Sequence, residues 1–478
     1  MTSPETTPQL TTRIVEINSD ELGQFEDKQT LERWIMPTAI TQNSSLTTAL
    51  QEAAKHLRTL NTPVAFPTET VYGLGADATN SNAVKGIYKA KGRPSDNPLI
   101  IHVCDLTMLR EVIAPDYTEK LAQGLSPPDP IPEIYKPLIK RFWPGPLTLL
   151  LPNSINSKLA YEVTAGLSTF AVRMPDSSLA LSLISLTGKP LAAPSANAST
   201  KPSPTTASHV LNDLSGKIEL IINGGLCKLG VESTVVDGLC QPPVVLRPGG
   251  VNIDVIRECE GWHNITTAYQ DCSENMPNAL RAPGMKYKHY SPKAQIVLYE
   301  PGLLYKISSK YDSQENLSSP KDVSWQIFEQ IFDIHSKASK TPVKIGIVRT
   351  RNWDSWGGLN DLIDSRHPLC IVKIINALEV QNPSISFELR KSEIWILVKE
   401  SSDGNSTHNC PMNKNKIADL FEIALGSDSR HIAQSLFASL RQMDECEVST
   451  IFVEGIEEDG DLAAAVINRL RKAASFIK

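Results

Sequence analysis

The chain has 478 residues, of which 41% are hydrophobic, and a formal net charge of −6. This length favours two or three domains, and the acidic balance excludes a global basic field for nucleic acid. The eight cysteines form no Cys-x-x-Cys pair, which argues against a disulfide framework or a zinc module and fits a reducing, cytoplasmic compartment. No apolar run approaches the ~18–20 residues of a membrane span.

The first part of the chain mixes strand and helix patterns. Residues 1–44 predict a weakly structured extension with a strand at Arg13–Ile17, and acids in this extension disfavour an organellar transit peptide. A helix then runs from Ser44 or Ser45 to Leu60, and a proline-dense loop follows within 123–136. The other expected strands are Val64–Phe66, Leu99–Val103, Leu147–Leu151, Thr169–Arg173, Leu191–Ala193, Leu220–Asn223, Ser233–Asp237 and Val244–Arg247, and the other expected helices lie near Asn82–Ala90, Leu138–Phe142, Ser177–Leu186 and Thr205–Leu214. Strands and helices do not alternate strictly, so we expect an α/β fold with a mixed, twisted sheet.

The second part predicts a separate domain. We divide the chain into an extension (1–44), a first domain (45–258), a linker (259–293) and a C-terminal α/β domain (294–478). The expected strands of that domain are Gln295–Tyr299, Val343–Val348, Cys370–Ile375, Ile394–Val398 and Ile451–Val453, and the expected helices lie near Val323–Lys337, Lys416–Ala424, Arg430–Met443 and Leu462–Lys472. This alternation indicates an open, mainly parallel, Rossmann-like sheet.

A basic segment, Tyr88 to Pro98, is the first candidate for chemistry. If it is extended, Lys91 and Arg93 face the same side and suit a polyphosphate. Pro94 predicts that the preceding helix ends here. The alternative is a solvated basic turn.

Loops are expected at Pro67–Gly75, Lys91–Asn97 and Pro194–Ser203. Because α/β sheets place ligands in loops that follow strand ends, we expect these three loops to converge on one crevice. No Gly-x-x-x-x-Gly-Lys-[Ser/Thr] loop is present, so side chains would have to hold any triphosphate. The candidates are Lys91, Arg93, Ser95, Asn97, Ser195, Asn197, Ser203 and Arg247. The alternative for the serines and asparagines is turn formation, and Arg247 could simply close the domain.

Four more residues keep two interpretations. His102, in an apolar strand, is either packed or a ligand. Arg173 is either paired with an acid or available to an anion such as a carboxylate. The hydroxyls of Thr68 and Ser233 either bind a ligand or cap the local backbone. The sequence shows no Ser-His-Asp elbow, no His-Glu-x-x-His motif and no paired-histidine metal site.

Six stretches of the first domain form a distinctive set of motifs. They are Phe66-Pro67-Thr68-Glu69-Thr70-Val71-Tyr72-Gly73-Leu74-Gly75, Lys91-Gly92-Arg93-Pro94 with Asn97-Pro98-Leu99, Ala193-Pro194-Ser195-Ala196-Asn197, Thr169–Pro175, Glu232-Ser233-Thr234 and Leu246-Arg247-Pro248-Gly249. Together they resemble the YrdC-type domain of the threonylcarbamoyl-AMP synthase family over about residues 44–258. The run from Pro283 to Pro292 is similar to the linker of the long, two-domain form, and the tail is similar to that form's second domain.

The resemblance implies synthesis of L-threonylcarbamoyladenylate from L-threonine, bicarbonate and ATP, with release of pyrophosphate. A separate tRNA threonylcarbamoyl transferase complex would then modify the adenosine beside the anticodon of ANN-decoding tRNAs. It implies a catalytic set and a larger ATP-binding set: Lys91, Arg93, Ser195 and Asn197, joined by Ser95, Asn97, Thr169, Ser203, Arg247 and Tyr290. It also implies a threonine-binding set: Thr68, His102, Arg173, Ala193 and Ser233.

Mg²⁺ is expected to accompany the ATP, but the sequence indicates no protein ligand for it. The sequence also leaves open whether the protein contacts RNA directly. The 123–136 stretch and the first 44 residues fall outside the resemblance. We hypothesise that the linker, with Lys286, Tyr287, His289 and Tyr290, folds over the nucleotide crevice and gates it. Two rival interpretations remain: a non-enzymatic double-stranded-RNA-binding module, and carbamoyl transfer from carbamoyl phosphate, which multidomain relatives perform with added zinc modules.

Overall fold

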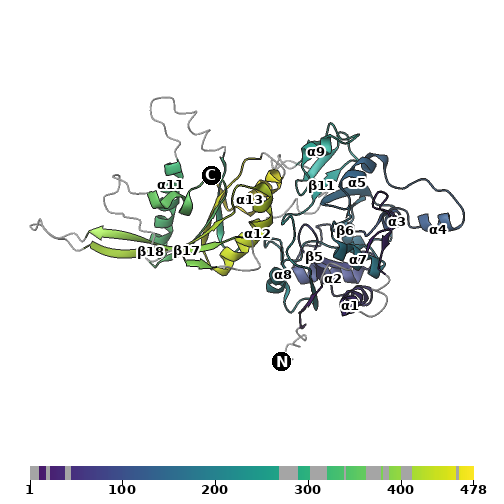
Figure 1. Cartoon of the computed structure of the whole chain (residues 1–478), viewed down its shortest axis with the longest axis horizontal. Helices are drawn as coiled ribbons and strands as arrows, with labels where there is room; N and C mark the ends of the chain where they lie inside the picture. Colours follow the sequence, from purple (N-terminus) through teal and green to yellow (C-terminus); the bar gives the residue numbers. More distant parts are fainter. Residues whose placement is uncertain are drawn as a thin grey trace, which may run out of the picture. The chain divides into compact units, whose positions relative to one another are not determined.

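The computed structural model describes residues 10–17, 22–37, 45–268, 289–301, 320–338, 341–361, 378–380, 387–399, 412–458 and 462–478. The chain divides into two units, one formed mainly by residues 1–289 and the other mainly by residues 290–478. Figure 1 shows the first unit in purple to teal and the second in green to yellow. Each unit is described by itself.

The first unit contains a central sheet with short helices around it. Its strands are β1 (Arg13–Glu16), β2 (Gln24–Phe25), β3 (Trp34–Ile35), β4 (Val64–Phe66), β5 (Gly73–Asp77), β6 (Ile100–His102), β7 (Leu147–Pro152), β8 (Thr169–Arg173), β9 (Leu191–Ala192), β10 (Leu220–Asn223), β11 (Thr234–Asp237), β12 (Val244–Arg247) and β13 (Thr266–Thr267). Its helices are α1 (Ser45–Thr59), α2 (Ser81–Lys91), α3 (Leu106–Ile113), α4 (Tyr117–Ala122), α5 (Lys136–Phe142), α6 (Tyr161–Thr164), α7 (Ser178–Thr187), α8 (Ala207–Leu214) and α9 (Ile253–Arg257), with a 3₁₀ turn at Glu133–Tyr135.

The central sheet of this unit has eleven strands in the order β1-β10-β4-β5-β9-β6-β8-β7-β11-β12-β13. The sheet contains parallel pairs, such as β6 with β8, and antiparallel pairs, such as β6 with β9. The prediction of a mixed α/β sheet is therefore confirmed. The arrangement also brings the ends of β6, β8 and β9, which are far apart in sequence, next to one another.

Helix α2 determines where the basic segment begins. Asn80 caps its first turn by accepting hydrogen bonds from the backbone of Asn82 and Ala83. Gly92, at φ 63°, ends it in the left-handed conformation that glycine adopts without strain. Lys91 is thus the last helical residue, which confirms that the helix ends before Pro94, and the extended form considered for Lys91 to Arg93 is not adopted. The two cations are separated by a helix end rather than aligned along a strand.

Gly73 and Gly75 lie in β5, although the sequence predicts a loop through them. A Cβ at Gly75 would lie 2.6 Å from the Phe66 ring, so the aromatic side chain of β4 occupies the space that a larger residue would need. Glycine in a strand commonly marks such a close approach. The predicted loop is therefore shorter, covering residues 67–72.

Residues 22–37 differ from the predicted weakly structured extension, because they pack on the first unit. Trp34 and Phe25 are in edge-to-face contact at 4.8 Å, and the Trp34 indole donates to the Ser182 hydroxyl on α7 at 3.2 Å. Arg110 on α3 joins Glu32 of this segment to Asp129 of the proline-dense stretch. That stretch also places Tyr135 in the core, fully buried.

The second unit is an open sheet with helices. Its elements are β14 (Gln295–Tyr299), α11 (Pro320–Lys337), β15 (Val343–Arg349), a 3₁₀ segment at Ser355–Asp361, β16 (Leu378–Val380), β17 (Leu389–Lys399), β18 (Met412–Ala424), α12 (Ser429–Glu445), β19 (Thr450–Glu454), α13 (Ala463–Ala473) and β20 (Phe476–Ile477). The strand order is β16-β17-β18-β15-β19-β14-β20. Strands from β18 to β20 in that order are parallel neighbours, and β17 joins β18 antiparallel. The mainly parallel sheet that the sequence predicts is confirmed.

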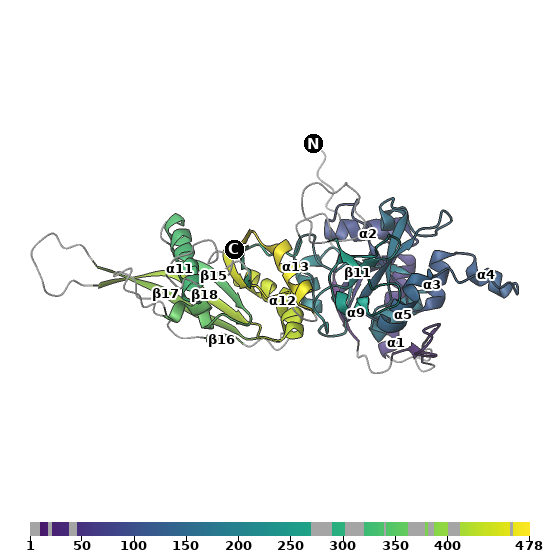
Figure 2. The same cartoon turned by 90° about the horizontal axis from the view of Figure 1, so that it is seen from above.

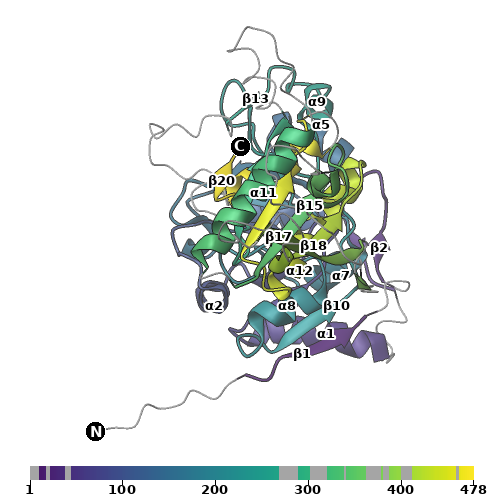
Figure 3. The ribbon, with the colours of Figure 1, turned by 90° about the vertical axis from the view of Figure 1, so that its left-hand side faces the viewer.

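Residues 416–424 belong to strand β18 rather than to the predicted helix, and Figure 2 shows β17 and β18 running side by side. Helix α11 lies across one face of the sheet (Figure 3), where its Ile327 and Ile331 pack with Ile345 of β15. Gly346, the next residue of β15, faces Met443 of α12. Helices therefore cover both faces. The strand predicted at Cys370–Ile375 lies outside the described residues.

Candidate active site

Three loops of the first unit are joined by backbone hydrogen bonds. The loop after β4 meets the loop after β9, because the Ala196 N–H donates to the Tyr72 carbonyl and the Leu74 N–H donates to the Pro194 carbonyl, both at 2.8 Å. The Ser199 N–H donates to the carbonyl of Lys91 at 2.8 Å. The sequence predicts that these loops converge, and the structure brings them together.

Lys91 connects the end of α2 to the loop after β9. Its side chain is 3% exposed, and its ammonium donates to the Ser195 carbonyl, to the Asn197 carbonyl at 2.7 Å and to the Asn197 side-chain oxygen at 3.3 Å. The Ser195 hydroxyl donates to the same Asn197 oxygen at 2.5 Å. Three of the four predicted catalytic residues thus form one cluster, in which Lys91 and Asn197 are buried and Ser195 is partly exposed. This excludes a fully solvated basic turn for Lys91.

Arg93, the fourth, lies beside this cluster and is partly exposed. Its guanidinium donates to the carbonyls of Asn97 and Pro98 at 3.4 and 3.1 Å. Asn97 is 1% exposed, and neither polar atom of its side chain has a hydrogen-bond partner among the described residues. Ser95 is exposed at the surface of the turn. The turn therefore places a cation and an unpaired amide close together.

His102 and Arg173 occupy matching positions on neighbouring strands. They are register partners in the parallel pair of β6 and β8, and both are about 4% exposed or less. Burial, and next the positive charge of Arg173, lower the pKa of His102 to about 3. His102 is therefore a neutral imidazole at physiological pH, and its Nδ1 atom has no hydrogen-bond partner among the described residues.

The guanidinium of Arg173 is held by three acceptors from two loops. It donates to Glu69 at 2.5 Å, to the Thr70 hydroxyl at 2.9 Å and to the Gly145 carbonyl at 3.1 Å. The Thr70 hydroxyl also contacts that of Thr68 at 2.8 Å, and Thr68 donates to the carbonyl of Val71 at 2.7 Å. Arg173 is thus paired with an acid, and Thr68 caps its own turn. For each of these two residues the sequence left two interpretations open, and the structure shows the acid pair for Arg173 and the local cap for Thr68.

Ser233 and Arg247 are in direct contact at the other side of β8. The Arg247 guanidinium donates to the Ser233 carbonyl at 2.9 Å and to its hydroxyl at 3.2 Å. The Ser233 hydroxyl also contacts that of Thr148 on β7 at 2.7 Å. Next to it, the carboxylate of Glu232 accepts from the Ser203 hydroxyl at 2.6 Å. Arg247, which is predicted to bind ATP, therefore touches Ser233, which is predicted to bind threonine.

The contacts described above for this centre do not include three further predicted residues. Ala193 follows β9 and donates its N–H to the Ile100 carbonyl at 2.9 Å. Thr169 begins β8, at the end of the strand opposite to Arg173. Tyr290 belongs to the second unit, where its ring stacks on Phe437 at 5.1 Å. Lys286 and Tyr287 lie outside the described residues.

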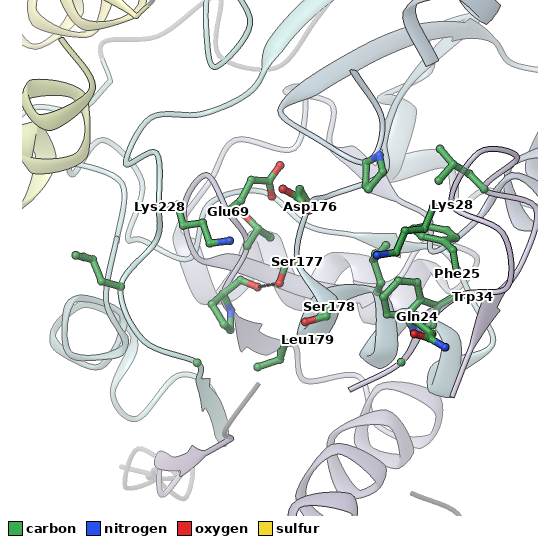
Figure 4. Close-up of a pocket in the computed structure, with 18 residues that line it drawn as sticks. Gln24, Phe25, Lys28, Trp34, Glu69, Asp176, Ser177, Ser178, Leu179 and Lys228 are labelled. Atoms are coloured by element: carbon green, nitrogen blue, oxygen red, sulfur yellow. Dashed lines mark hydrogen bonds between the residues drawn. The ribbon is translucent and has the colours of Figure 1, made fainter. Parts of the chain in front are cut away.

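A cavity of about 480 Å³ borders the loop after β4. Its walls are residues 23–34, the loop 67–69, the start of α7 and residues 224–228. In Figure 4, Phe25, Lys28 and Trp34 lie together on one side, and Glu69 and Asp176 lie on another. Among the predicted threonine-binding residues, Thr68 lines this cavity. The loop that carries Thr68 and Glu69 therefore faces open space as well as Arg173.

Cys227 lies against the same loop. It is 2% exposed, its N–H donates to the Thr205 carbonyl at 3.0 Å, and nearby the Leu229 N–H donates to the Glu69 carbonyl at 2.8 Å. Burial raises the pKa of the Cys227 thiol well above its usual value. This cysteine is consequently an uncharged thiol and a poor nucleophile in the folded protein.

Comparison with known proteins covers nearly all of this chain. Residues 58–249 match a family model described as "Telomere recombination", and residues 251–475 match one described as "Threonylcarbamoyl-AMP synthase, C-terminal domain". The threonylcarbamoyl-AMP synthase of Schizosaccharomyces pombe is 40% identical over 445 residues, which cover 91% of this chain and 90% of that protein. The chain belongs to the threonylcarbamoyl-AMP synthase family. Its member from Pyrococcus abyssi is 38% identical over 86% of this chain and 90% of that protein.

A solved structure extends the similarity to this synthase family's two-part architecture. The crystal structure of P. abyssi Sua5 complexed with L-threonine is 35% identical to this chain, covers 98% of it and 99% of its own chain, and has a TM-score of 0.63. The predicted YrdC-like fold and second α/β domain are in agreement with this neighbour. None of the helices in the described parts of the chain is long and apolar enough to cross a membrane.

Three polar residues of the centre are absent from the residue sets predicted for this synthase family member. They are Glu69, Thr70 and Glu232, each a hydrogen-bond acceptor for a predicted site residue. The signal for Glu69 was present, because an arginine at the end of a buried strand requires either an acid or an anion. Which acid supplies that charge depends on the path of the chain, and sequence spacing does not give it.

Proposed function

We propose that this chain synthesises L-threonylcarbamoyladenylate at the centre formed by Lys91, Ser195, Asn197 and Arg173. L-threonine, bicarbonate and ATP are the substrates, and pyrophosphate is released. The observation that carries the proposal is the clustering of Lys91 with Ser195 and Asn197, which lie 104 and 106 residues away in sequence. The buried Lys91 ammonium, held by backbone and amide oxygens of the loop after β9, places a fixed positive charge where phosphate charge can be neutralised.

The nucleotide occupies the Lys91 side of the centre. Lys91 and Arg93 neutralise phosphate charge, and Asn97, Ser195 and Asn197 supply polar contacts. Ser95, Thr169, Ser203, Arg247 and Tyr290 complete the proposed ATP-binding set. The unpaired, buried amide of Asn97 supports this assignment, because a buried amide without partners is costly unless a ligand satisfies it.

Threonine occupies the Arg173 side. Arg173 has five N–H groups, of which three are bonded to the protein, so it can still bind a carboxylate. His102 is neutral and carries an unpartnered Nδ1 beside it. Thr68, Ala193 and Ser233 are the remaining members of the proposed pocket. The contact between Ser233 and Arg247 then joins the two halves of the site.

The reaction requires positioning and charge neutralisation more than acid–base chemistry. Bicarbonate supplies carbon dioxide, which threonine's amine takes up as a carbamate with net release of water and a proton. The carbamate oxygen then attacks the α-phosphorus, and pyrophosphate leaves. Mg²⁺ enters with the oxygen-rich triphosphate as part of the nucleotide substrate. The described residues include no group of three or more potential metal ligands.

The remaining assignments concern the rest of the chain. We propose a first domain at 45–258, a linker at 259–293 that gates the crevice, a C-terminal domain at 294–478 and a cytoplasmic location. The product passes to a tRNA threonylcarbamoyl transferase complex for modification of ANN-decoding tRNAs.

Pyrophosphate release from ATP tests the proposed function. We expect release only when both L-threonine and bicarbonate are present. Release that needs neither would contradict the proposal, and measurable RNA affinity without ATP turnover would favour the non-enzymatic RNA-binding alternative. Turnover with carbamoyl phosphate in place of threonine and bicarbonate would favour carbamoyl transfer instead.

A further inference from the structure

The Glu69 carboxylate has one oxygen that the protein does not use. Oε2 pairs with the Arg173 guanidinium at 2.5 Å, and the two side chains are 4% and 5% exposed. Oε1 is buried and has no hydrogen-bond partner among the described residues. Leaving a buried, charged acceptor unpaired is destabilising, so this oxygen calls for a donor.

The surroundings of Glu69 restrict which donor fits. Glu232, another buried carboxylate of the centre, accepts from Ser203, whereas Glu69 faces Arg173 and also borders the 480 Å³ cavity. Glu69 is therefore not enclosed by side chains on every side. Figure 4 shows it on the cavity wall, with Asp176 on one side of it and Lys228 on the other. A positively charged donor is favoured over a neutral one.

An α-amino acid carries opposite charges on one carbon atom, and the Glu69–Arg173 pair presents opposite charges side by side. A carboxylate bound to the free N–H groups of Arg173 would bring its own ammonium group close to Glu69. We propose that Glu69 Oε1 binds the α-ammonium group of L-threonine. This inference rests on the proposed threonine site around Arg173, and it makes Glu69 the residue that selects amino acids over other carboxylic acids.

Calorimetric binding to the full-length chain tests the contact. The ligands are L-threonine and 2,3-dihydroxybutanoate, which carries a hydroxyl where threonine has its ammonium group. We expect Glu69→Gln to weaken threonine binding by about tenfold to hundredfold, the range for a lost hydrogen bond to a charged group. Binding of the hydroxy acid, measured by competition, should change less than about threefold on the same scale. Glu258→Gln, which removes an exposed carboxylate paired with Arg141, is the matched control and should alter neither affinity.

The two ligands separate binding from positioning. Equal weakening of both would mean that Glu69 only holds Arg173, and no weakening of either would mean that it makes no contact; each result overturns the inference. Wild-type protein that binds neither ligand would refute the proposed threonine site itself. Should Glu69→Gln fail to fold, Glu69→Asp, which keeps the charge, takes its place. Equal affinities for threonine and for the hydroxy acid, in both the wild type and this variant, would also overturn the proposal.

Discussion

Lys91 is the residue on which the proposed chemistry depends most directly. Its ammonium already holds three oxygens of Ser195 and Asn197, so it both shapes the loop and supplies charge. We expect Lys91→Ala to lower adenylate formation about 10²-fold or more, by analogy with the loss of one oxyanion-type donor. Initial rates of pyrophosphate release measure this. Lys89→Ala removes an exposed lysine of the same segment and should stay within about twofold; near-normal turnover of Lys91→Ala would refute the assigned role.

His102 should make the stability of the first unit depend on pH. Its pKa is 6.5 in the unfolded chain and about 3 in the folded one, so between these values the unfolded state binds the proton. Stability is therefore fully present above pH 6.5 and falls as pH falls toward 3. Going from pH 7 to 5 should cost about 2 kcal/mol through this group alone.

Apparent melting temperatures of wild type and His102→Gln at pH 7 and pH 5 provide the measurement. The variant should lose less stability on acidification than the wild type, because glutamine does not titrate. An identical pH dependence in both proteins would show that His102 is not buried in its neutral form.

At the scale of elements, helix α2 contains two glycines with different roles. A Cβ at Gly86 would lie 2.2 Å from the Asn61 carbonyl, whereas a Cβ at Gly92 would meet nothing within 4 Å. Gly86→Ala should therefore push α2 away from the loop before β4 and cost more than about 2 kcal/mol. Gly92→Ala should cost about 1 kcal/mol, through its left-handed backbone alone. Thermal unfolding of both variants measures the difference, and equal losses would contradict this account of the helix.

Elements also show where sequence reasoning succeeds and fails. β8 and β10 could be predicted to the residue, because each is a short apolar run between clear turn signals. β18 was mistaken for a helix because it is covered on both faces, with Ile417, Leu420 and Ile423 all buried. A strand buried on both sides loses its alternation, and its apolar residues then fall at helical spacing as well.

The site was only partly predictable for a related reason. The motifs identify Lys91, Ser195 and Asn197, and the structure shows that they touch. Their partners are set by long-range register: Glu69 meets Arg173 because the loop after β4 lies beside the end of β8, 104 residues later. Spacing along a chain does not encode such a pair.

At the scale of the whole molecule, each unit has its own hydrophobic core. One cluster joins residues such as Phe66, Leu149 and Ile222, and another joins Val297, Ile345 and Phe452. Deletion of residues 284–478 should thus leave the first unit folded. If the linker gates the nucleotide crevice, adenylate formation should still fall about tenfold or more. Circular dichroism and the pyrophosphate assay measure the two effects, and a folded fragment with full activity would argue against gating.

The rate at which Cys227 is alkylated would report movement of the turn that covers it. Its thiol is sealed beneath the turn that carries Thr68 and Glu69, so an alkylating reagent can reach it only during the moments when that turn swings away. The alkylation rate of Cys227 would then measure how often the turn opens. A substrate that bridges Glu69 and Arg173 would keep this turn closed and lower the alkylation rate of Cys227.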